Sequence, residues 1–161
     1  MFDAALPDQA RDVLNAARAK NIRIVTAESC TGGLIAGLLT EIPGSSDVVE
    51  RGFVTYSNEA KEESLGVPAA LLSKYGAVSG QVARAMADGA LRHARAQLAI
   101  AVTGIAGPGG GSAEKPIGLV YIAVADNSGT ASHEYRFGDI GRGEVRLATV
   151  REAIKLLRAA L

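Results

Sequence analysis

The sequence predicts an α/β fold: a three-layer α/β/α sandwich with a central mixed, largely parallel sheet. Patterns typical of helices and strands alternate along the chain, which is the arrangement found in layered α/β domains. With 161 residues, the chain is long enough to bury roughly two-thirds of its unfolded surface in one core. We see no internal repeat and no linker that would divide it. We therefore expect a single domain over residues 1–161.

The first half of the chain begins with a helix and then alternates. Apolar residues at helical spacing predict a helix over residues 6–20, and β-branched residues predict a buried strand over 22–26. We then expect, in order, a Gly/Ala-rich helix over 31–40, a loop over 43–46, a strand over 48–56, a helix over 58–65 that stops at Gly66, and a short helix up to Lys74.

The second half contains the clearest helix, over residues 82–96, followed by two apolar runs at 98–102 and 118–125. The stretch between these runs is dominated by glycine and proline and cannot be regular structure. We expect the two runs to be neighbouring core strands. Alternation over 132–137 predicts a strand with one exposed face, and residues 143–161 predict an amphipathic closing helix.

Composition excludes several classes of function. The chain carries 17 basic and 17 acidic residues, so we expect no general electrostatic footprint for nucleic acid. It has one cysteine and two histidines, which form neither an internal disulfide nor a zinc ligand set. No targeting signal or long apolar span is present, so we expect a cytoplasmic protein without membrane contact.

The segment AESCTGG, residues 27–33, places a serine on a bend between the first strand and the next helix. A hydroxyl from Ser29 or Thr31 can cap that helix, and its free amides can bind a phosphate or a developing oxyanion. The alternative is an ordinary strand-to-helix turn. Cys30 is an alternative nucleophile, because a helix N-terminus lowers the pKa of a thiol.

A glycine-rich loop follows the predicted strand at 98–102. Its glycines allow the backbone amides to wrap around a phosphate or carboxylate, and ligands of α/β sheets bind where parallel strands end. The loop matches neither a P-loop nor GxGxxG, and a flexible surface loop is the alternative. The glycines concerned are Gly104, Gly107, Gly109, Gly110 and Gly111.

The segment YSNEAK, residues 56–61, supplies candidates for proton transfer. Lys61 can act as a general base if burial lowers its pKa, so that a Ser–Lys pair replaces a Ser–His–Asp triad. Tyr56 shares a site with Lys61 only if it ends the preceding strand. The alternatives are a solvated helix lysine and a packed aromatic ring.

Three long motifs in order, AESCTGG, GFVTYSNEAK and VTGIAGPGGGSAEKPIG, give the chain a nearly full-length resemblance to a known family. The chain resembles the CinA C-terminal domain family, which includes the nicotinamide-nucleotide amidohydrolases of the PncC type. The resemblance implies hydrolysis of nicotinamide mononucleotide to nicotinate mononucleotide and ammonia, without a metal or organic cofactor. It also implies a homo-oligomer. The alternative is a non-catalytic nucleotide-binding or competence-associated module.

The resemblance also implies roles for individual residues. Ser29 would be the nucleophile, activated by Tyr56 and Lys61. Its proton would pass to Lys61 directly or through Tyr56, and the amides of Cys30 and Thr31 would hold the oxyanion. Arg142, with the glycine-rich loop, would lie near the substrate phosphate. The expected substrate contacts are therefore Cys30, Thr31, Gly32, Thr103, Gly104, Gly107, Gly109, Gly110 and Arg142.

Overall fold

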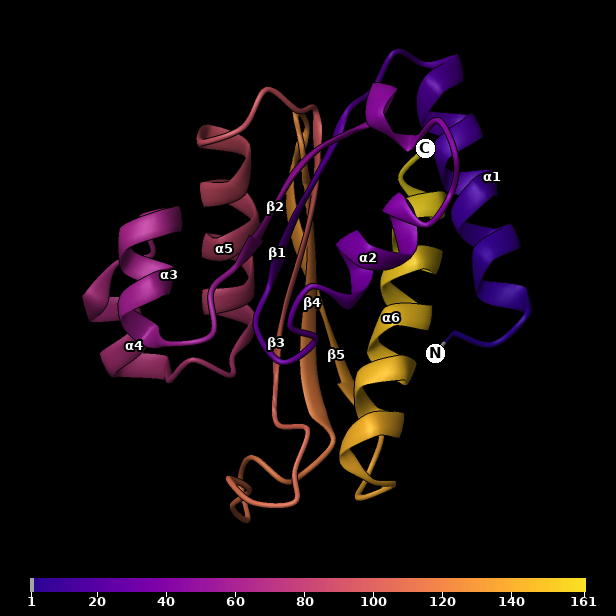
Figure 1. Cartoon of the computed structure of the whole chain (residues 1–161). Coiled ribbons are helices and arrows are strands. Elements are labelled where there is room, and N and C mark those ends of the chain that lie inside the picture. The colour runs from indigo at the N-terminus through magenta and orange to yellow at the C-terminus, as the bar shows by residue number, and fades with distance from the viewer. Residues whose placement is uncertain (1) are drawn as a thin grey trace.

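A computed structural model describes residues 2–161, and within them five strands form one sheet in the order β2-β1-β3-β4-β5 (Figure 1). The strands are β1 (Ile24–Glu28), β2 (Val49–Val54), β3 (Leu98–Gly104), β4 (Leu119–Asp126) and β5 (Gly129–Arg136). β1 pairs in parallel with β2 and β3, whereas β4 is antiparallel to both β3 and β5. Of these strands, only β4 runs in the opposite direction, which confirms the predicted mixed, largely parallel sheet. The pairing of β3 with β4 confirms that the two apolar runs are neighbouring strands.

Helices cover both faces of the sheet, which confirms the three-layer prediction. Figure 1 shows α1, α2 and α6 on one face and α3, α4 and α5 on the other. The helices are α1 (Ala5–Ala19), α2 (Leu34–Thr40), α3 (Asn58–Leu65), α4 (Ala69–Tyr75), α5 (Gly80–Arg92) and α6 (Arg142–Ala159), with a short 3₁₀ turn at Ser45–Asp47.

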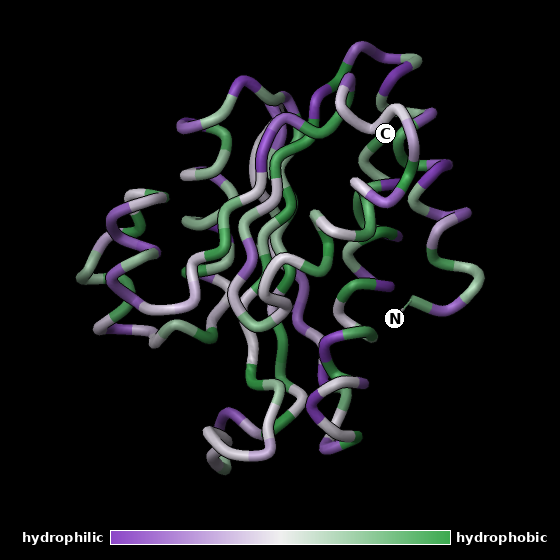
Figure 2. Tube along the Cα trace, in the orientation of Figure 1, coloured by the Kyte–Doolittle hydropathy of each residue, from purple (hydrophilic) through white to green (hydrophobic). Residues whose placement is uncertain are grey.

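The core consists of two apolar clusters, one on each face of the sheet. Side chains of a strand alternate between faces, so Ile100 and Val102 of β3 join the cluster under α1 and α6, whereas Ala99 and Ala101 join the cluster under α5. Figure 2 shows the apolar residues concentrated along the central strands. The alanines on one face let α5 lie close to the sheet.

Element boundaries differ from the predictions at a few places. β1 extends to residue 28 and α2 starts at residue 34, so residues 29–33 form an irregular turn, here called the nucleophile turn. α5 begins at residue 80 because the Ser79 hydroxyl accepts a hydrogen bond from the Val82 amide. β5 begins three residues earlier than predicted because it pairs with β4 up to a tight turn, where Asp126 faces Gly129.

None of the helices described within residues 2–161 combines the length and the apolar character needed to cross a membrane.

Candidate active site

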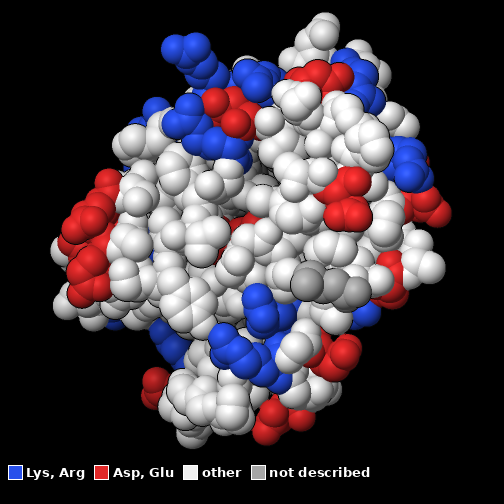
Figure 3. Space-filling model, viewed as in Figure 1, with Lys and Arg blue, Asp and Glu red and all other residues white. Residues whose placement is uncertain are grey.

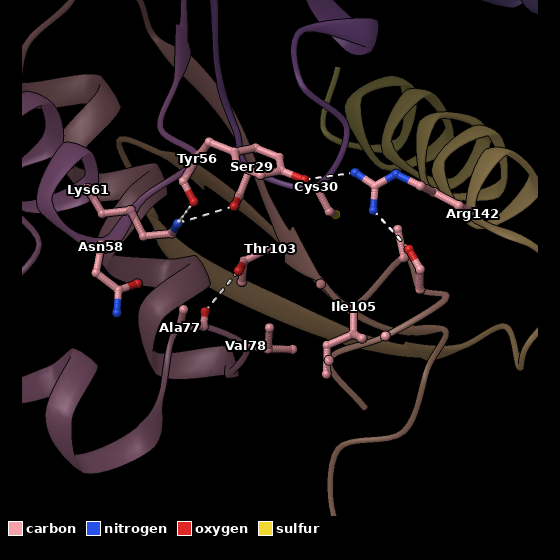
Figure 4. A pocket seen from close by; sticks show the side chains of 15 residues that line it. Ser29, Cys30, Tyr56, Asn58, Lys61, Ala77, Val78, Thr103, Ile105 and Arg142 are labelled. Carbon is pink, nitrogen blue, oxygen red and sulfur yellow. Dashed lines mark hydrogen bonds between the residues drawn. The ribbon is translucent and has the colours of Figure 1, made fainter. Parts of the chain in front are cut away.

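The carboxyl ends of β1, β2 and β3 bring three sequence motifs to one edge of the sheet. The nucleophile turn follows β1, residues 55–57 follow β2, and a long irregular loop follows β3. These three strands are mutually parallel, so the segments that follow them meet. They surround a cavity of about 270 Å³ (Figure 4).

Ser29 and Lys61 contact each other inside this cavity. Ser29 comes directly after β1, and Lys61 lies in the first turn of α3, whose N-terminus is capped by Ser57. Lys61 Nζ lies 3.1 Å from Ser29 Oγ, as Figure 4 shows. Lys61 is only 1% exposed, so it is not a solvated helix lysine.

The surroundings of Lys61 make its amine easier to deprotonate than that of an exposed lysine. Burial lowers the pKa of this amine. Nζ donates to the Thr55 carbonyl at 2.9 Å and lies 3.5 and 3.4 Å from the carbonyls of Tyr56 and Ser57. Within residues 2–161, no carboxylate forms a salt bridge with it. A neutral amine can direct its two N–H groups at carbonyls and its lone pair at the Ser29 hydroxyl.

Tyr56 lies two residues beyond β2, and its backbone carbonyl and its phenol oxygen contact different residues. Its carbonyl faces Lys61, whereas its phenol oxygen accepts a hydrogen bond from Arg142 Nη2 at 2.8 Å. Figure 4 shows the ring extending past Ser29 toward Arg142. Arg142 Nη1 also donates to the Gly107 carbonyl at 2.9 Å. The structure therefore brings Ser29 and Lys61 together directly and places the Tyr56 hydroxyl beside Arg142.

Glu28, which the sequence did not single out, organises the start of α2. Its side chain is fully buried, and its carboxylate accepts hydrogen bonds from the Thr31 hydroxyl and from the amides of three residues, Gly33, Ile35 and Ala36. The prediction that Ser29 or Thr31 caps this helix is wrong, because the carboxylate takes those amides instead. A helix N-terminus favours an anion, so an acidic residue just before a small-residue turn is the signal that could have identified it.

Arg146, also missed from the sequence, holds the nucleophile turn from the side of α6. Its Nε donates to the Cys30 carbonyl at 3.1 Å and its Nη2 to the Thr31 carbonyl at 3.0 Å. Gly32 has a positive φ of 59°, and a Cβ there would lie 3.4 Å from the Arg146 guanidinium. Neither Thr31 nor Gly32 is among the residues that line the cavity. The hydroxyl and carbonyl of Thr31 hold the turn in shape, whereas its amide has no partner within residues 2–161.

The thiol of Cys30 lines the cavity but is not activated. Burial is the main cause that raises the pKa of Cys30 to about 12, and the nearby Glu28 carboxylate contributes to the same shift. This shift is opposite to the one expected at a helix N-terminus, because burial disfavours the charged thiolate. The thiol therefore stays protonated near neutral pH, which favours Ser29 over Cys30 as the nucleophile.

The glycine-rich loop forms the wall of the cavity opposite Lys61. Its lining residues include Gly104, Gly107, Gly109 and Gly110, together with Thr103 at the end of β3. Gly104 is required by packing, because a Cβ there would lie 2.6 Å from a methyl group of Val120. Gly109 has open space around it, so its backbone is free to approach a ligand.

A small apolar wall completes the cavity, together with the amide side chain of Asn58. Sequence reasoning missed the apolar residues of this wall, because small apolar side chains in loops carry no pattern of their own. The Thr103 hydroxyl ties part of this wall to β3 by donating to the Ala77 carbonyl at 2.8 Å. The apolar residues are Ala77, Val78, Ile105 and Ala106.

The model of the CinA C-terminal domain matches residues 7–161 of this sequence. The chain belongs to the CinA C-terminal domain family. All three motifs by which it resembles that family contribute residues to the one cavity: Ser29 from the first, Lys61 from the second and Thr103 from the third.

Solved CinA-family structures share this fold over almost the whole chain. The competence/damage inducible protein CihA from Agrobacterium tumefaciens is 56% identical with a TM-score of 0.96, and the match covers 99% of this chain and 97% of that one. The competence damage-inducible protein A from Klebsiella pneumoniae is 35% identical with a TM-score of 0.92, over 96% of this chain and 95% of that one.

Curated CinA-family relatives are considerably longer than this chain. A CinA-like protein from Geobacter sulfurreducens is 54% identical over 144 residues, which are 89% of this chain and 35% of the relative. A putative competence-damage inducible protein from Caldicellulosiruptor bescii is 52% identical over 140 residues, 86% of this chain and 34% of the relative. The chain thus spans about a third of the length of these relatives.

Proposed function

We propose that this CinA-family chain is a serine amidase that hydrolyses nicotinamide mononucleotide to nicotinate mononucleotide and ammonia. The observation that carries the proposal is the contact between Ser29 Oγ and the buried Nζ of Lys61, at 3.1 Å. Burial lowers the pKa of Lys61, and in its neutral form this amine can accept a hydroxyl proton, as in other Ser–Lys hydrolases. Because the chain resembles amidohydrolases of this family, the scissile bond is a carboxamide.

The first half of the reaction releases ammonia. Ser29 Oγ attacks the carboxamide carbon while its proton passes to Lys61 Nζ. The amides of Cys30 and Thr31 stabilise the oxyanion, and within residues 2–161 neither amide donates to another residue. When the tetrahedral intermediate collapses, its carbon–nitrogen bond breaks and Lys61 returns the proton to the departing nitrogen. The products are ammonia and an ester of Ser29.

The second half restores the enzyme. A water molecule attacks the ester carbonyl and gives one proton to Lys61, and the same two amides hold the second oxyanion. The bond between carbon and Ser29 Oγ then breaks, and Ser29 recovers a proton from Lys61. The carboxylic acid that forms loses its remaining proton to solvent and leaves as the carboxylate. Lys61 carries the Ser29 proton to the departing nitrogen and one proton of the water back to Ser29, so the proposed acid–base steps need no metal ion. Within residues 2–161, no cluster of three His, Cys, Asp or Glu side chains is placed to hold one.

The remaining walls of the cavity suit a nucleotide that carries a pyridinium ring. Val78 and Ile105 offer apolar surface for the ring. Arg142 and the glycine-rich loop offer a cation and backbone amides for the 5′-phosphate. Arg142 reaches the cavity already oriented by Tyr56 and Gly107.

The proposal is tested by measuring ammonia release from nicotinamide mononucleotide after chelator treatment. We expect activity in the wild type and a loss of at least about 10³-fold in Ser29→Ala and in Lys61→Ala. Ser64→Ala and Lys155→Ala, which change exposed side chains of the same types, serve as matched controls and should keep full activity.

Two other outcomes would contradict the proposal. Absence of ammonia release from a folded wild type would overturn it, and binding of the nucleotide by that same protein would favour the non-catalytic module. Activity that survives Ser29→Ala would show that Ser29 is not the nucleophile.

A further inference from the structure

We infer that Arg146 is a positioning residue that orients the oxyanion-binding amides of the nucleophile turn, and this inference rests on the proposed function. Arg146 lies in the second turn of α6 and donates to two successive carbonyls, those of Cys30 and Thr31. A planar guanidinium can hold two acceptors at once in a fixed geometry. Its contacts are therefore with the backbone of the turn and not with the cavity.

The planarity of the peptide bond transmits these contacts to the amides. In a trans peptide the C=O and the following N–H point in opposite directions. The Cys30 carbonyl is fixed on Arg146, so the Thr31 N–H points away from α6. The Ser29 carbonyl accepts from the Gly32 amide at 3.0 Å, so the Cys30 N–H also has a fixed direction. Arg146 thus orients the Thr31 N–H, and the Gly32 amide orients the Cys30 N–H.

The two donors are fixed but unpaired, and Cys30 lines the cavity. Within residues 2–161, the amides of Cys30 and Thr31 donate no hydrogen bond to another residue. A cation on the carbonyl of a peptide also polarises that peptide, so its N–H becomes a stronger donor. Arg146 thereby strengthens the Thr31 amide where negative charge develops in the transition state.

Arg142 and Arg146 lie four residues apart on α6, so they share one face of that helix. Figure 3 shows basic side chains gathering low on this face of the molecule, where α6 begins. Arg142 reaches into the cavity, whereas Arg146 stays behind the turn and forms no salt bridge within residues 2–161. Arg142 is therefore placed to affect substrate binding, and Arg146 is placed to affect the chemical step.

The test compares Arg146→Met and Arg146→Lys with Arg151→Met, which removes an arginine of the same helix that pairs with Asp3 on the surface. For each variant, kcat and KM are measured with nicotinamide mononucleotide. The rate of Ser29 phosphonylation by a fluorophosphonate is measured as well. In that reaction Ser29 Oγ bonds to phosphorus, fluoride leaves, the proton passes to Lys61, and the phosphoryl oxygen occupies the oxyanion position.

We expect Arg146→Met to lower both kcat and the phosphonylation rate about 10²-fold, with KM within about twofold of wild type. For Arg146→Lys, both rates should fall between those of Arg146→Met and the wild type, because one ammonium cannot hold two carbonyls as a guanidinium does. Arg151→Met should match the wild type. A rise in KM with unchanged kcat, or an unchanged phosphonylation rate in a folded Arg146 variant, would overturn the inference.

Two features keep the outcome decisive. If Arg146→Met does not fold, the folded Arg146→Lys variant decides the question: a reduced rate supports the inference and a wild-type rate overturns it. If the wild type releases no ammonia, the proposed substrate is wrong, but the phosphonylation rates still report on Arg146. Failure of the inference and failure of the proposed function are therefore distinguishable.

Discussion

At the scale of the residue, the proposed chemistry of the site depends on Lys61. It is among the largest fully buried side chains of residues 2–161, and its partners there are three carbonyls and one hydroxyl. Burial without a counter-charge disfavours the ammonium form. The same amine that would be inert as a base on the surface can therefore accept a proton from Ser29 nearer to neutral pH.

The lowered pKa of Lys61 predicts the direction of the pH dependence. The ammonium form cannot accept a proton, so kcat/KM should rise with pH as Lys61 loses its proton. Because burial lowers the pKa, the midpoint should lie below the ordinary value of 10.5. The measurement is kcat/KM for ammonia release between pH 6 and pH 11, with stability checked at each pH. A rate that falls as pH rises toward the midpoint would contradict the general-base role.

At the scale of the element, small details of packing decide which helices tolerate change. Two helical glycines illustrate this contrast. A Cβ on Gly89 of α5 would lie only 2.0 Å from the Leu65 carbonyl at the end of α3, whereas a Cβ on Gly37 of α2 would meet nothing within 4 Å. Gly89 therefore lets α5 lie against the end of α3, whereas Gly37 has no such role.

These two glycines should respond to alanine with opposite signs. We expect Gly89→Ala to lower the free energy of unfolding by about 2 kcal/mol, because α5 must move away from α3. Gly37→Ala should raise it by about 0.5–1 kcal/mol, because alanine is the better helix former at an unobstructed position. Urea denaturation measures both. An equal effect of the two substitutions would show that the close approach of α5 to α3 does not matter.

The cap of α2 provides a second prediction at this scale. Glu28→Gln keeps the shape of the side chain but replaces a carboxylate oxygen with an NH₂ group that faces backbone donors. We expect a loss of about 3 kcal/mol in the free energy of unfolding. The exposed Glu41 at the other end of the same helix is the control. If Glu28→Gln and Glu41→Gln have the same stability, the carboxylate does not hold this helix.

At the scale of the whole molecule, the site is assembled from distant parts of the chain. Arg142 donates to Tyr56, 86 residues away in sequence, and Arg146 donates to Cys30, 116 residues away. The sheet makes these contacts possible, because its parallel strands end at one edge and α6 packs beside that edge.

Removing Arg142 should affect binding more than chemistry. We expect Arg142→Ala to raise KM for nicotinamide mononucleotide about tenfold or more, with kcat changed less. The proposed role of the guanidinium is to bind the substrate phosphate, and its contacts are with Tyr56 and Gly107 and not with Ser29. Steady-state kinetics check this split. Arg136, which pairs with Glu134 on the surface, offers a control. A fall in kcat with KM unchanged would count against a phosphate-binding role.

The sequence was sufficient for the layers of the fold and for the pair at the centre of the site. Alternating apolar patterns identify the helices and strands, and the motif around Ser29 and the motif around Lys61 carry the resemblance. It was not sufficient for Glu28 or Arg146, because each acts on backbone groups. Backbone amides and carbonyls are alike at every position, so which of them a side chain will meet is decided only when the chain folds.

Because α6 follows all five strands in the chain, it also affects when the residues of the candidate site come together during synthesis. Residues 142–159 leave the ribosome after the sheet and Ser29 have emerged. Until that helix docks, neither arginine can reach the cavity or the turn. A nascent or clipped chain that lacks α6 would carry the Ser–Lys pair but neither arginine, so the full set of residues in the proposed mechanism comes together only once α6 has docked.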